Sequence, residues 1–404
     1  MIAAFPQPLS SKARPPMEIL HVITDLNVGG AEMMLYRLLQ TPEFKHYSHE
    51  VVSLTDLGAI ADRLQQIGIR SRALGMSRVP NPLKVLRLAR LVRQIRPALV
   101  QTWMYHANLV GGVAARIAGN TRVVWTIHSS RLDPKRARRS TLWTVALGAK
   151  LSHRVPDSIV AVSRTSRDHH VAAGYDPEKF VVLPNGFDLE LYRPDLTSRR
   201  QVREELGLEQ STVLIGLVAR MDPVKDHFGF VRAAALLAKR QPNVRFLFCG
   251  DGATQNNSEL VRAIREAGLS DRFHLLGRRD DVPRVMNSLD IATLCSASGE
   301  AFPLVIGEAM ACGVPCVVTD LGDCAHLVGD TGCVVSPENP AALSLAWQQL
   351  VCLGTEGRQQ LGLQARQRIE MHFSLSRIAA DYAALYSRVL QGCAADRFVG
   401  VLAQ

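Results

Sequence analysis

The chain has 404 residues, which is too long for a single hydrophobic core and favours two domains of ordinary size. Hydrophobic residues make up 47% of it and charged residues 21%, as in globular proteins, and no run of eighteen apolar residues predicts a membrane-spanning helix. The net charge of +10 favours an anionic partner, for which nucleic acid, an anionic membrane surface and anionic substrates all qualify.

The first strong pattern begins after a short extension. Residues 1–17 carry Pro6, Pro8 and Lys12 where a signal peptide would be apolar, so we expect a flexible extension and a cytoplasmic protein. Residues 18–25 are rich in Ile and Val and predict a buried parallel strand. A loop with Gly29 and Gly30 follows, before a helix at 31–40. The GxGxxG spacing is absent, and the pair serves either close approach to a ligand or simple chain reversal.

A first domain is predicted over residues 18–190. After the first helix, strands are predicted at 49–54, 98–102, 122–127, 158–162 and 179–184. Helical patterns lie between them, near 56–67, 82–95, 106–118, 140–152 and 164–173. This alternation predicts a parallel, doubly wound sheet of the α/β class.

His128 directly follows the strand at 122–127, at the carboxyl edge where such sheets place their ligands. A basic loop comes next. We predict an acceptor-binding group that consists of His106, Arg131, Lys135 and Arg136. His106 has a simpler interpretation, since it would also pack or cap the start of its helix. A second basic run occupies 82–96, and solvated charged faces are the alternative explanation for both runs.

The turn signal Pro184-Asn185-Gly186 closes the first domain, and a second is predicted over residues 191–373. Its strands are predicted at 213–218, 244–249, 273–276, 290–294 and 315–319, with helices at 226–238, 257–267 and 282–287. The apolar spacing of 374–391 predicts a C-terminal helix that crosses back to the first domain, followed by a tail at 392–404. All eight cysteines lie at or after Cys249 without a CxxC pair, and we interpret them as reduced core residues.

The segment from Cys295 to Leu321 organises the second domain. Two carboxylates, Glu300 and Glu308, flank a short helix, with Pro303 expected in its first turn and Gly313 at its end. The N–H groups of Leu304, Val305 and Ile306 would then face outward at the positive end of the helix dipole, as a phosphate site requires. A phosphate cradle between two carboxylates suits a nucleotide sugar. The alternative is a surface helix with one solvated Glu and one favoured by the dipole.

These segments together resemble the GT-B glycosyltransferases, specifically family 4 of retaining, nucleotide-sugar-dependent enzymes. The resemblance extends from about residue 18 to residue 390. The matching pieces are Gly29-Gly30-Ala31-Glu32, His128, Val162-Ser163, Pro184-Asn185-Gly186-Phe187-Asp188, Ala219-Arg220 with Lys225, Gly250-Asp251-Gly252, Glu300-Ala301-Phe302-Pro303-Leu304 through Glu308, and Thr319-Asp320.

The resemblance implies two Rossmann-like domains that face each other across a cleft, and it implies roles for single residues. Glu308 would bind the ribose and Glu300 the donor sugar, and His128 would lie near the anomeric carbon. The remaining donor-site residues would contact the diphosphate or the base: Gly29, Gly30, Arg220, Lys225, Gly277, Arg278, Phe302, Pro303, Leu304 and Val305. His128 and Glu300 are the catalytic candidates, acting by position and not as a covalent nucleophile.

The chemistry predicted from the residues agrees. Breaking a sugar–phosphate bond leaves negative charge on the diphosphate, which Arg220, Lys225 and the helix N-terminus would stabilise. No DxD-type metal motif occurs at the expected place, so we expect no metal and no cofactor. One position departs from the family, because His326 stands where a Glu is usual. We interpret this as a change near the site and not as a loss of activity.

The predicted function is therefore transfer of a sugar from a UDP- or GDP-linked donor to a hydroxyl of a lipid-linked saccharide or a cell-surface polysaccharide precursor. The basic runs suggest that the protein binds the inner face of the cell membrane peripherally. A non-catalytic sugar-nucleotide-binding or partner protein on the same fold is the alternative. A nucleic-acid partner is disfavoured, because aromatic residues do not alternate with the basic runs. A phosphorylase would need a lysine for pyridoxal phosphate that nothing singles out.

Overall fold

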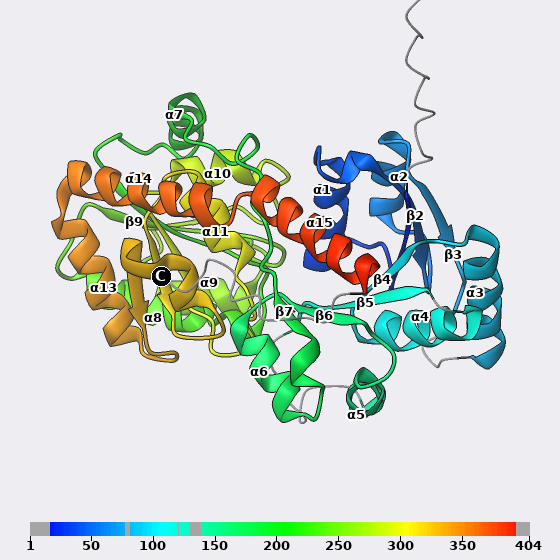
Figure 1. Cartoon of the computed structure of the whole chain (residues 1–404). Coiled ribbons are helices and arrows are strands. Elements are labelled where there is room, and N and C mark those ends of the chain that lie inside the picture. The colour runs from blue at the N-terminus through cyan, green and yellow to red at the C-terminus, as the bar shows by residue number, and fades with distance from the viewer. Residues whose placement is uncertain (1–16, 77–80, 120, 130–138, 393–404) are drawn as a thin grey trace, which may run out of the picture.

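A computed structural model describes residues 17–76, 81–119, 121–129 and 139–392 of the chain. It has two lobes, each built on one parallel sheet with helices packed against it (Figure 1). The predicted α/β class with two doubly wound sheets is therefore confirmed. None of the described helices is both long and apolar enough to cross a membrane.

The first lobe holds a seven-stranded sheet in the order β3-β2-β1-β4-β5-β6-β7. Its strands are β1 (Met17–Ile23), β2 (Tyr47–Ser53), β3 (Arg70–Ala73), β4 (Leu99–Trp103), β5 (Arg122–Ile127), β6 (Ser158–Ala161) and β7 (Phe180–Val182). Its helices are α1 (Gly30–Gln40), α2 (Ala59–Gln66), α3 (Pro82–Ile95), α4 (Tyr105–Ala118), α5 (Arg139–Ser152) and α6 (Arg164–Ala172). The sequence patterns missed β3, an edge strand with no buried residue and two arginines in four positions.

The second lobe holds a six-stranded sheet in the order β10-β9-β8-β11-β12-β13. Its strands are β8 (Val213–Val218), β9 (Val244–Cys249), β10 (Phe273–Leu275), β11 (Ile291–Leu294), β12 (Cys316–Thr319) and β13 (Gly332–Val335). Its helices are α7 (Leu196–Glu205), α8 (His227–Ala238), α9 (Ser258–Glu266), α10 (Val282–Ser288), α11 (Leu304–Ala311), α12 (Cys324–Val328), α13 (Pro340–Cys352) and α14 (Gly354–His372). The patterns gave no strand at β13 and no helix at α12, α13 or α14.

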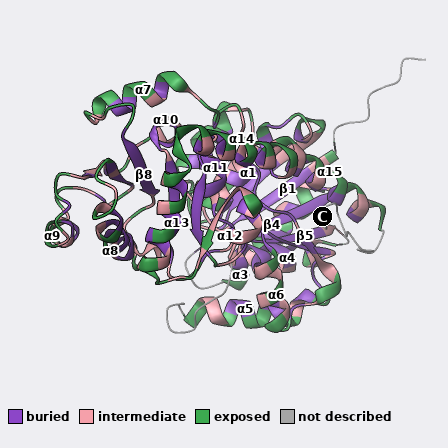
Figure 2. Ribbon diagram, turned by 90° about the vertical axis from the view of Figure 1, so that its left-hand side faces the viewer, coloured by how far each residue is buried: buried purple, intermediate pink, exposed green. Residues whose placement is uncertain are grey.

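The central strands β4 and β11 are buried along their whole length, as parallel strands covered on both faces must be (Figure 2). In each lobe the strand order reverses between the first strand and a later neighbour: β1 lies between β2 and β4, and β8 lies between β9 and β11. Ligands of such sheets bind at the carboxyl ends of the strands beside this switch point. The two switch points therefore predict where the site should be assembled.

The last helix, α15 (Leu375–Gln391), leaves the second lobe and packs against the first (Figure 1). Its buried Tyr382 stacks on Trp103 of β4, and the hydroxyl of Tyr386 donates a hydrogen bond to Gln101. Where α15 begins, Phe187 and Ser374 form a parallel bridge between the two segments that join the lobes. Two adjacent segments of the chain therefore connect the lobes, and not a single linker.

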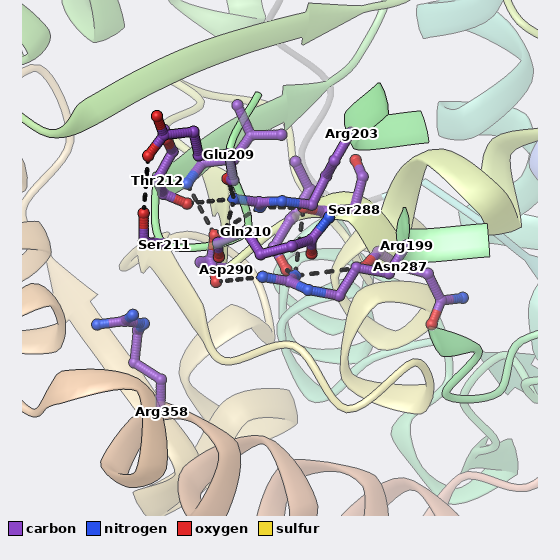
Figure 3. A network of polar contacts seen from close by, with 12 residues as sticks. Arg199, Arg203, Glu209, Gln210, Ser211, Thr212, Asn287, Ser288, Asp290 and Arg358 are labelled. Atoms are coloured by element: carbon purple, nitrogen blue, oxygen red, sulfur yellow. Dashed lines mark hydrogen bonds and ion pairs between the residues drawn. The ribbon is translucent and has the colours of Figure 1, made fainter. Parts of the chain in front are cut away.

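A buried ionic network attaches α7 to the second sheet (Figure 3). The carboxylate of Asp290, just before β11, binds Arg199 at 2.8 Å and Arg203 at 3.1 Å. Arg203 is fully buried and also donates to the carbonyls of Glu209 and Thr212. These hydrogen bonds offset much of the cost of burying a guanidinium, although Nε of Arg203 has no partner among the described residues. This network lies at the amino ends of the strands, away from the switch point.

Candidate functional site

Helix α11 begins one residue later than the sequence suggested. Pro303 is the residue before the helix and not part of its first turn, while Gly313 follows its end with a φ of 74°. The prediction that the N–H of Ile306 is free was wrong, because this N–H donates to the carbonyl of Pro303 at 3.2 Å. The N–H groups of Leu304 and Val305 make no hydrogen bond to another described residue. Two outward donors, not three, therefore remain at the start of α11.

The position of α11 depends on one close contact. The ring of Phe187 lies so near the helix that a β-carbon at Gly307 would come within 2.0 Å of it. Only glycine fits there. Phe302 stacks on the same ring, with centroids 6.0 Å apart, and is buried. The side chain of Phe302 thus anchors the start of α11 in the core, and its predicted contact with a donor would come from its backbone.

Lys225 and Glu300 lie side by side although 75 residues separate them. The loops that carry them are joined by a hydrogen bond from the Ala297 N–H to the carbonyl of Val224 at 2.8 Å. The Lys225 ammonium pairs with Oε1 of Glu300, which also accepts from Ser296 Oγ at 2.6 Å. Glu300 is 9% exposed. The second lobe therefore presents a fixed cation beside the start of α11, held by a mostly buried carboxylate.

The other predicted donor contacts lie further out. Arg220 follows β8, has a side chain that is 70% exposed, and pairs with Asp222 at 3.0 Å. Arg278 is likewise exposed and lies 3.9 Å from Asp280. The N–H of Gly277 donates to Ala253, and its carbonyl accepts from Gly250. Because the Gly277 N–H is already used, any backbone donor for a nucleobase must come from its neighbours.

Glu308 lies one turn further along α11 and meets the first lobe. Its Oε1 lies 3.3 Å from Nη2 of Arg37 on α1, and both side chains are nearly buried, at 12% and 11% exposure. Burial raises the pKa of the Glu308 carboxyl, and the Arg37 guanidinium and a hydrogen bond from Tyr192 partly oppose that rise. Glu308 is thus a desolvated carboxylate whose charge depends on a cation from the other lobe.

The glycine loop of the first lobe lies against the same helix. A β-carbon added at Gly30 would be 3.4 Å from the side chain of Leu304, and one at Gly29 would come within 2.3 Å of the Glu32 carboxylate. The loop backbone can therefore approach α11 closely, as a contact to a phosphate there would require. The structure brings the glycine pair and the α11 cradle together, as the resemblance implied.

The first lobe contributes a neutral, aromatic part of the candidate site, which we call the neutral wall. His128 follows β5 and stacks on Trp103, with ring centroids 5.5 Å apart and planes inclined by 27°. Burial lowers the pKa of His128 to about 3, so the ring is neutral at physiological pH. Its Nε2 is buried and has no hydrogen-bond partner among the described residues. A buried, unpaired ring nitrogen is costly unless a ligand uses it.

Trp103 is itself held by a chain of hydrogen bonds. Its Nε1–H donates to Nδ1 of His21 at 3.3 Å, Nε2 of His21 lies 3.1 Å from Nδ1 of His49, and Nε2 of His49 lies 2.9 Å from the carbonyl of Phe44. A carbonyl only accepts, so Nε2 of His49 must donate to it. Because Nδ1 of His21 accepts from Trp103, the proton of His21 is on Nε2, which donates to Nδ1 of His49. Each ring then has one tautomer, and both histidines are neutral. Burial lowers the pKa of both, in keeping with that assignment.

The predicted acceptor-binding residues are described only in part. His106 lies in the first turn of α4, half-buried, at the carboxyl edge of the first sheet. Arg131, Lys135 and Arg136 lie outside the described residues. The unusual His326 lies on α12 with its ring 5.9 Å from that of Phe373, and its carbonyl accepts from Arg368.

Sequence reasoning missed four residues that shape this site: Arg37, Trp103, Tyr192 and Ser296. Arg37 had a usable signal, because it is the one basic residue in the largely apolar helix at 31–40. Trp103 had a usable signal too, because it is an aromatic residue at the end of a strand, and His128 directly follows the neighbouring strand. Nothing in the sequence indicates that Tyr192 and Ser296 meet Glu308 and Glu300. No three His, Cys, Asp or Glu side chains gather as metal ligands in the described part of the chain.

Comparisons with known sequences agree with this geometry. Residues 28–191 match the family described as Glycosyltransferase Family 4, and residues 212–352 match Glycosyl transferases group 1. The UDP-Gal:alpha-D-GlcNAc-diphosphoundecaprenol alpha-1,3-galactosyltransferase of Escherichia coli is 27% identical over 274 residues, which cover 66% of this chain and 69% of that protein. The putative glycosyltransferase EpsF of Bacillus subtilis (strain 168) is 24% identical over 311 residues, 75% of this chain and 79% of that protein.

Solved structures show the same architecture. HepE from Anabaena in complex with UDP superimposes with a TM-score of 0.81 at 24% identity, over 92% of this chain and 100% of that one. HepE in complex with UDP-glucose gives a TM-score of 0.78 at 25% identity, over 92% and 99%. Fold and site thus define a glycosyltransferase of the GT-B type. The chain belongs to glycosyltransferase family 4, which confirms the resemblance found in the sequence.

Proposed function

We propose that this enzyme transfers a sugar from a UDP-linked donor to a hydroxyl of a lipid-linked saccharide or a cell-surface polysaccharide precursor. Transfer would retain the anomeric configuration and need no metal. The observation that carries the proposal is the assembly at the start of α11. There Lys225 with Glu300, the free N–H groups of Leu304 and Val305, and the glycine loop of the other lobe meet.

Each part of this assembly matches one part of a nucleotide sugar. The N–H groups at the start of α11 and the Lys225 ammonium are donors for the diphosphate, whose negative charge grows as the sugar leaves. Glu308 would accept hydrogen bonds from the two ribose hydroxyls, and Glu300 would accept them from hydroxyls of the donor sugar. Lys225 and the helix dipole supply the positive charge that a divalent metal supplies elsewhere.

The neutral wall suits the sugar and the acceptor. The reacting sugar gains positive charge in the transition state, and a cationic histidine beside it would oppose that change. His128 is kept neutral by burial and offers Nε2 as an acceptor. The leaving phosphate would take the proton of the attacking hydroxyl on the same face of the sugar. Retention is then expected, and proton NMR of the sugar first released by slow donor hydrolysis would reveal its anomer.

The relatives support the UDP donor and the lipid-linked acceptor. Two of the structural neighbours are complexes with UDP and with UDP-glucose, and the Escherichia coli relative is named for a UDP-galactose donor and a diphosphoundecaprenol acceptor. A lipid-linked acceptor lies at a membrane, and the first lobe has matching surface features. Trp143 on α5 is 77% exposed, and Leu83 on α3 is 73% exposed next to the exposed Arg87 and Arg90.

Leu83, Arg87 and Trp143 lie in the first halves of α3 and α5, and helices of such a sheet begin at the edge where the strands end. Aromatic, aliphatic and basic groups together are typical of a surface that binds anionic lipid. We therefore expect peripheral binding to the membrane through this face. Co-sedimentation with vesicles of anionic lipid, weakened by salt and by Trp143→Ala, would support it. Equal binding to neutral vesicles would contradict it.

The decisive experiment is calorimetric titration of the protein with UDP and with GDP, with and without EDTA. Wild type should bind UDP with a micromolar dissociation constant that EDTA does not change, and Glu308→Ala should lose most of that affinity. Tighter binding of GDP than of UDP would mean that the donor is a GDP-linked sugar. Loss of binding in EDTA would overturn the metal-free cradle, and no binding of either nucleotide would overturn the donor site itself.

A further inference from the structure

The ion pair between Arg37 and Glu308 joins the two lobes at the donor site. Arg37 comes from α1, which follows the glycine loop of the first lobe, and Glu308 comes from α11 of the second. The carboxylate that is placed to bind the ribose is therefore already bound by a residue of the other lobe. Only Oε1 is used in this way, and a carboxylate offers about four acceptor positions over its two oxygens. Arg37 and a ribose diol can bind Glu308 together.

The Arg37 side chain is held by a second contact as well. Its guanidinium lies 5.8 Å from the centroid of the Tyr192 ring, within the range of a cation–π interaction. Tyr192 belongs to the segment that joins the lobes, and it is fixed there by hydrogen bonds from its N–H to Asp188 and from Arg366 to its carbonyl. The hydroxyl of Tyr192 also hydrogen-bonds Glu308. Three segments, one from each lobe and one between them, thus meet around a single carboxylate.

A second bridge closes the lobes elsewhere without involving this carboxylate. Asp323, just before α12, accepts hydrogen bonds from the N–H groups of Arg164 and Thr165 at 2.8 and 3.0 Å and from the Thr165 hydroxyl at 2.8 Å. A carboxylate at a helix N-terminus is a stabilising pairing, and here helix α6 and the carboxylate come from different lobes. Removing Arg37 therefore need not separate the lobes, so its effect on the donor site can be measured by itself.

We propose that Arg37 is a positioning residue of the donor site: it holds the Glu308 carboxylate ionised and oriented across the cleft, so that the ribose subsite is complete only while the lobes are closed. The inference rests on the proposed role of Glu308 in binding the nucleotide. It adds that nucleotide binding and lobe closure stabilise each other through one ion pair, because each favours the state that the other needs.

The groups around Glu308 determine how the loss of Arg37 would change its protonation. Arg37 and Tyr192 face it, and Cys312 lies one turn along α11 with a thiol whose pKa burial raises to about 12, so it stays neutral. Arg366 of α14 is engaged by the carbonyls of Tyr192 and Ala311 and by Glu370. Arg37 is therefore the cation that opposes the effect of burial on Glu308. Without it the carboxyl would take up a proton at a higher pH, and a protonated carboxyl has lost both the negative charge and one of the two acceptor oxygens that a ribose diol would use.

The test is titration of the full-length protein with UDP between pH 5 and pH 8, for wild type, Arg37→Met, Arg37→Lys and the control Arg63→Met. Arg63 is an exposed arginine on the neighbouring helix α2. We expect Arg37→Met to weaken UDP binding by about tenfold at pH 7 and to begin losing affinity at a higher pH than wild type. Arg37→Lys should restore part of both, and Arg63→Met should behave as wild type. Thermal unfolding of each variant without UDP verifies folding.

Binding of UDP by Arg37→Met that equals or exceeds wild type at every pH would overturn the proposal. So would a tenfold loss with an unchanged pH profile in both Arg37 variants, because that would indicate a packing defect. If Arg37→Met does not fold, Arg37→Lys and Tyr192→Phe decide, since both keep the side-chain volume and should shift the acid limb of UDP binding. If wild type binds no nucleotide, the proposed function fails and the role of Arg37 falls with it. If wild type binds UDP and the Arg37 variants bind it equally well, only the role of Arg37 is overturned.

Discussion

The parts of the candidate site that the two lobes contribute solve opposite electrostatic problems. The wall from the second lobe is ionised: Lys225 pairs with Glu300, and Glu308 meets Arg37. The wall from the first lobe is neutral, with His128 stacked on Trp103 and the pKa of His128 lowered to about 3 by burial. Both walls are largely desolvated, but one compensates burial by pairing charges and the other by avoiding them.

The difference follows from where charge develops during transfer. The leaving diphosphate gains negative charge, and fixed cations and N–H groups stabilise it best when water is excluded. The sugar carbon gains positive charge, so uncharged acceptors suit its surroundings. A cleft with two ionised walls would hold the ground state strongly, whereas one ionised wall favours the separation of charge itself. The variants below break or sharpen this contrast.

Removing the cation of the ionised wall should have the largest effect. Lys225→Ala deletes a donor aimed at the diphosphate, and we expect kcat for transfer or donor hydrolysis to fall by about 10²–10³-fold. Arg220→Ala is the matched comparison on the same loop. Because its side chain is 70% exposed and paired with Asp222, we expect a much smaller fall. Steady-state release of UDP measures both.

Equal losses in the two variants would show that charge near this loop matters and that the buried pairing of Lys225 does not. Lys225→Arg refines the comparison, since it keeps the positive charge but replaces the compact ammonium by a planar guanidinium. Thermal unfolding should accompany each assay, because Glu300 keeps only the Ser296 hydroxyl as a described side-chain partner once Lys225 is lost.

The sequence predicted the ionised wall far better than the neutral one. Glu300, Glu308, Lys225 and the start of α11 follow from local patterns, such as a proline before a short helix and a glycine after it. Their partners do not, because Arg37 is 271 residues from Glu308 and only the assembled fold brings them together. The same limit explains Ile306, whose N–H turned inward to Pro303 because the helix began one residue later than expected.

The fold followed from the alternation of strands and helices, and the errors lie where that signal is weak. β3 is an edge strand with exposed arginines, so it lacks the apolar run of a buried parallel strand. β13 has four residues and none is fully buried. His128 was predicted from its place after β5, but its neutrality depends on its burial in the assembled fold, where its ring stacks on Trp103.

Acid should destabilise the fold through the buried histidines of the neutral wall. His128 has a pKa of about 3 in the folded chain, against about 6.5 when unfolded, so the unfolded state binds the extra proton between these values. The stability that His128 contributes is therefore complete above pH 6.5 and is lost as pH falls toward 3, by ~2 kcal/mol at pH 5. Burial lowers the pKa of His21 and His49 too, and their losses add in the same direction.

Urea unfolding at pH 7.5 and pH 5 measures this loss. His128→Asn should reduce the difference in unfolding free energy between the two pH values, because asparagine does not titrate while His21 and His49 still contribute. His46→Asn, at an exposed histidine of the same lobe, should leave the wild-type difference in place. An unchanged difference in His128→Asn would mean that His128 is protonated in the folded protein, and the neutral wall would have to be abandoned.

The smallest change tests whether the neutral wall is held from behind. Trp103→Phe keeps an aromatic ring for His128 to stack on but removes the Nε1–H that His21 accepts, which leaves Nδ1 of His21 buried without its donor. Leaving one buried acceptor unsatisfied costs ~1 kcal/mol, and we expect this loss in unfolding free energy together with a few-fold fall in kcat. The combined variant Trp103→Phe with His21→Phe removes donor and acceptor together and should recover part of the stability. If it does, the histidine chain stabilises the tryptophan through that hydrogen bond; if the two losses simply add, Trp103 acts on His128 by its shape alone.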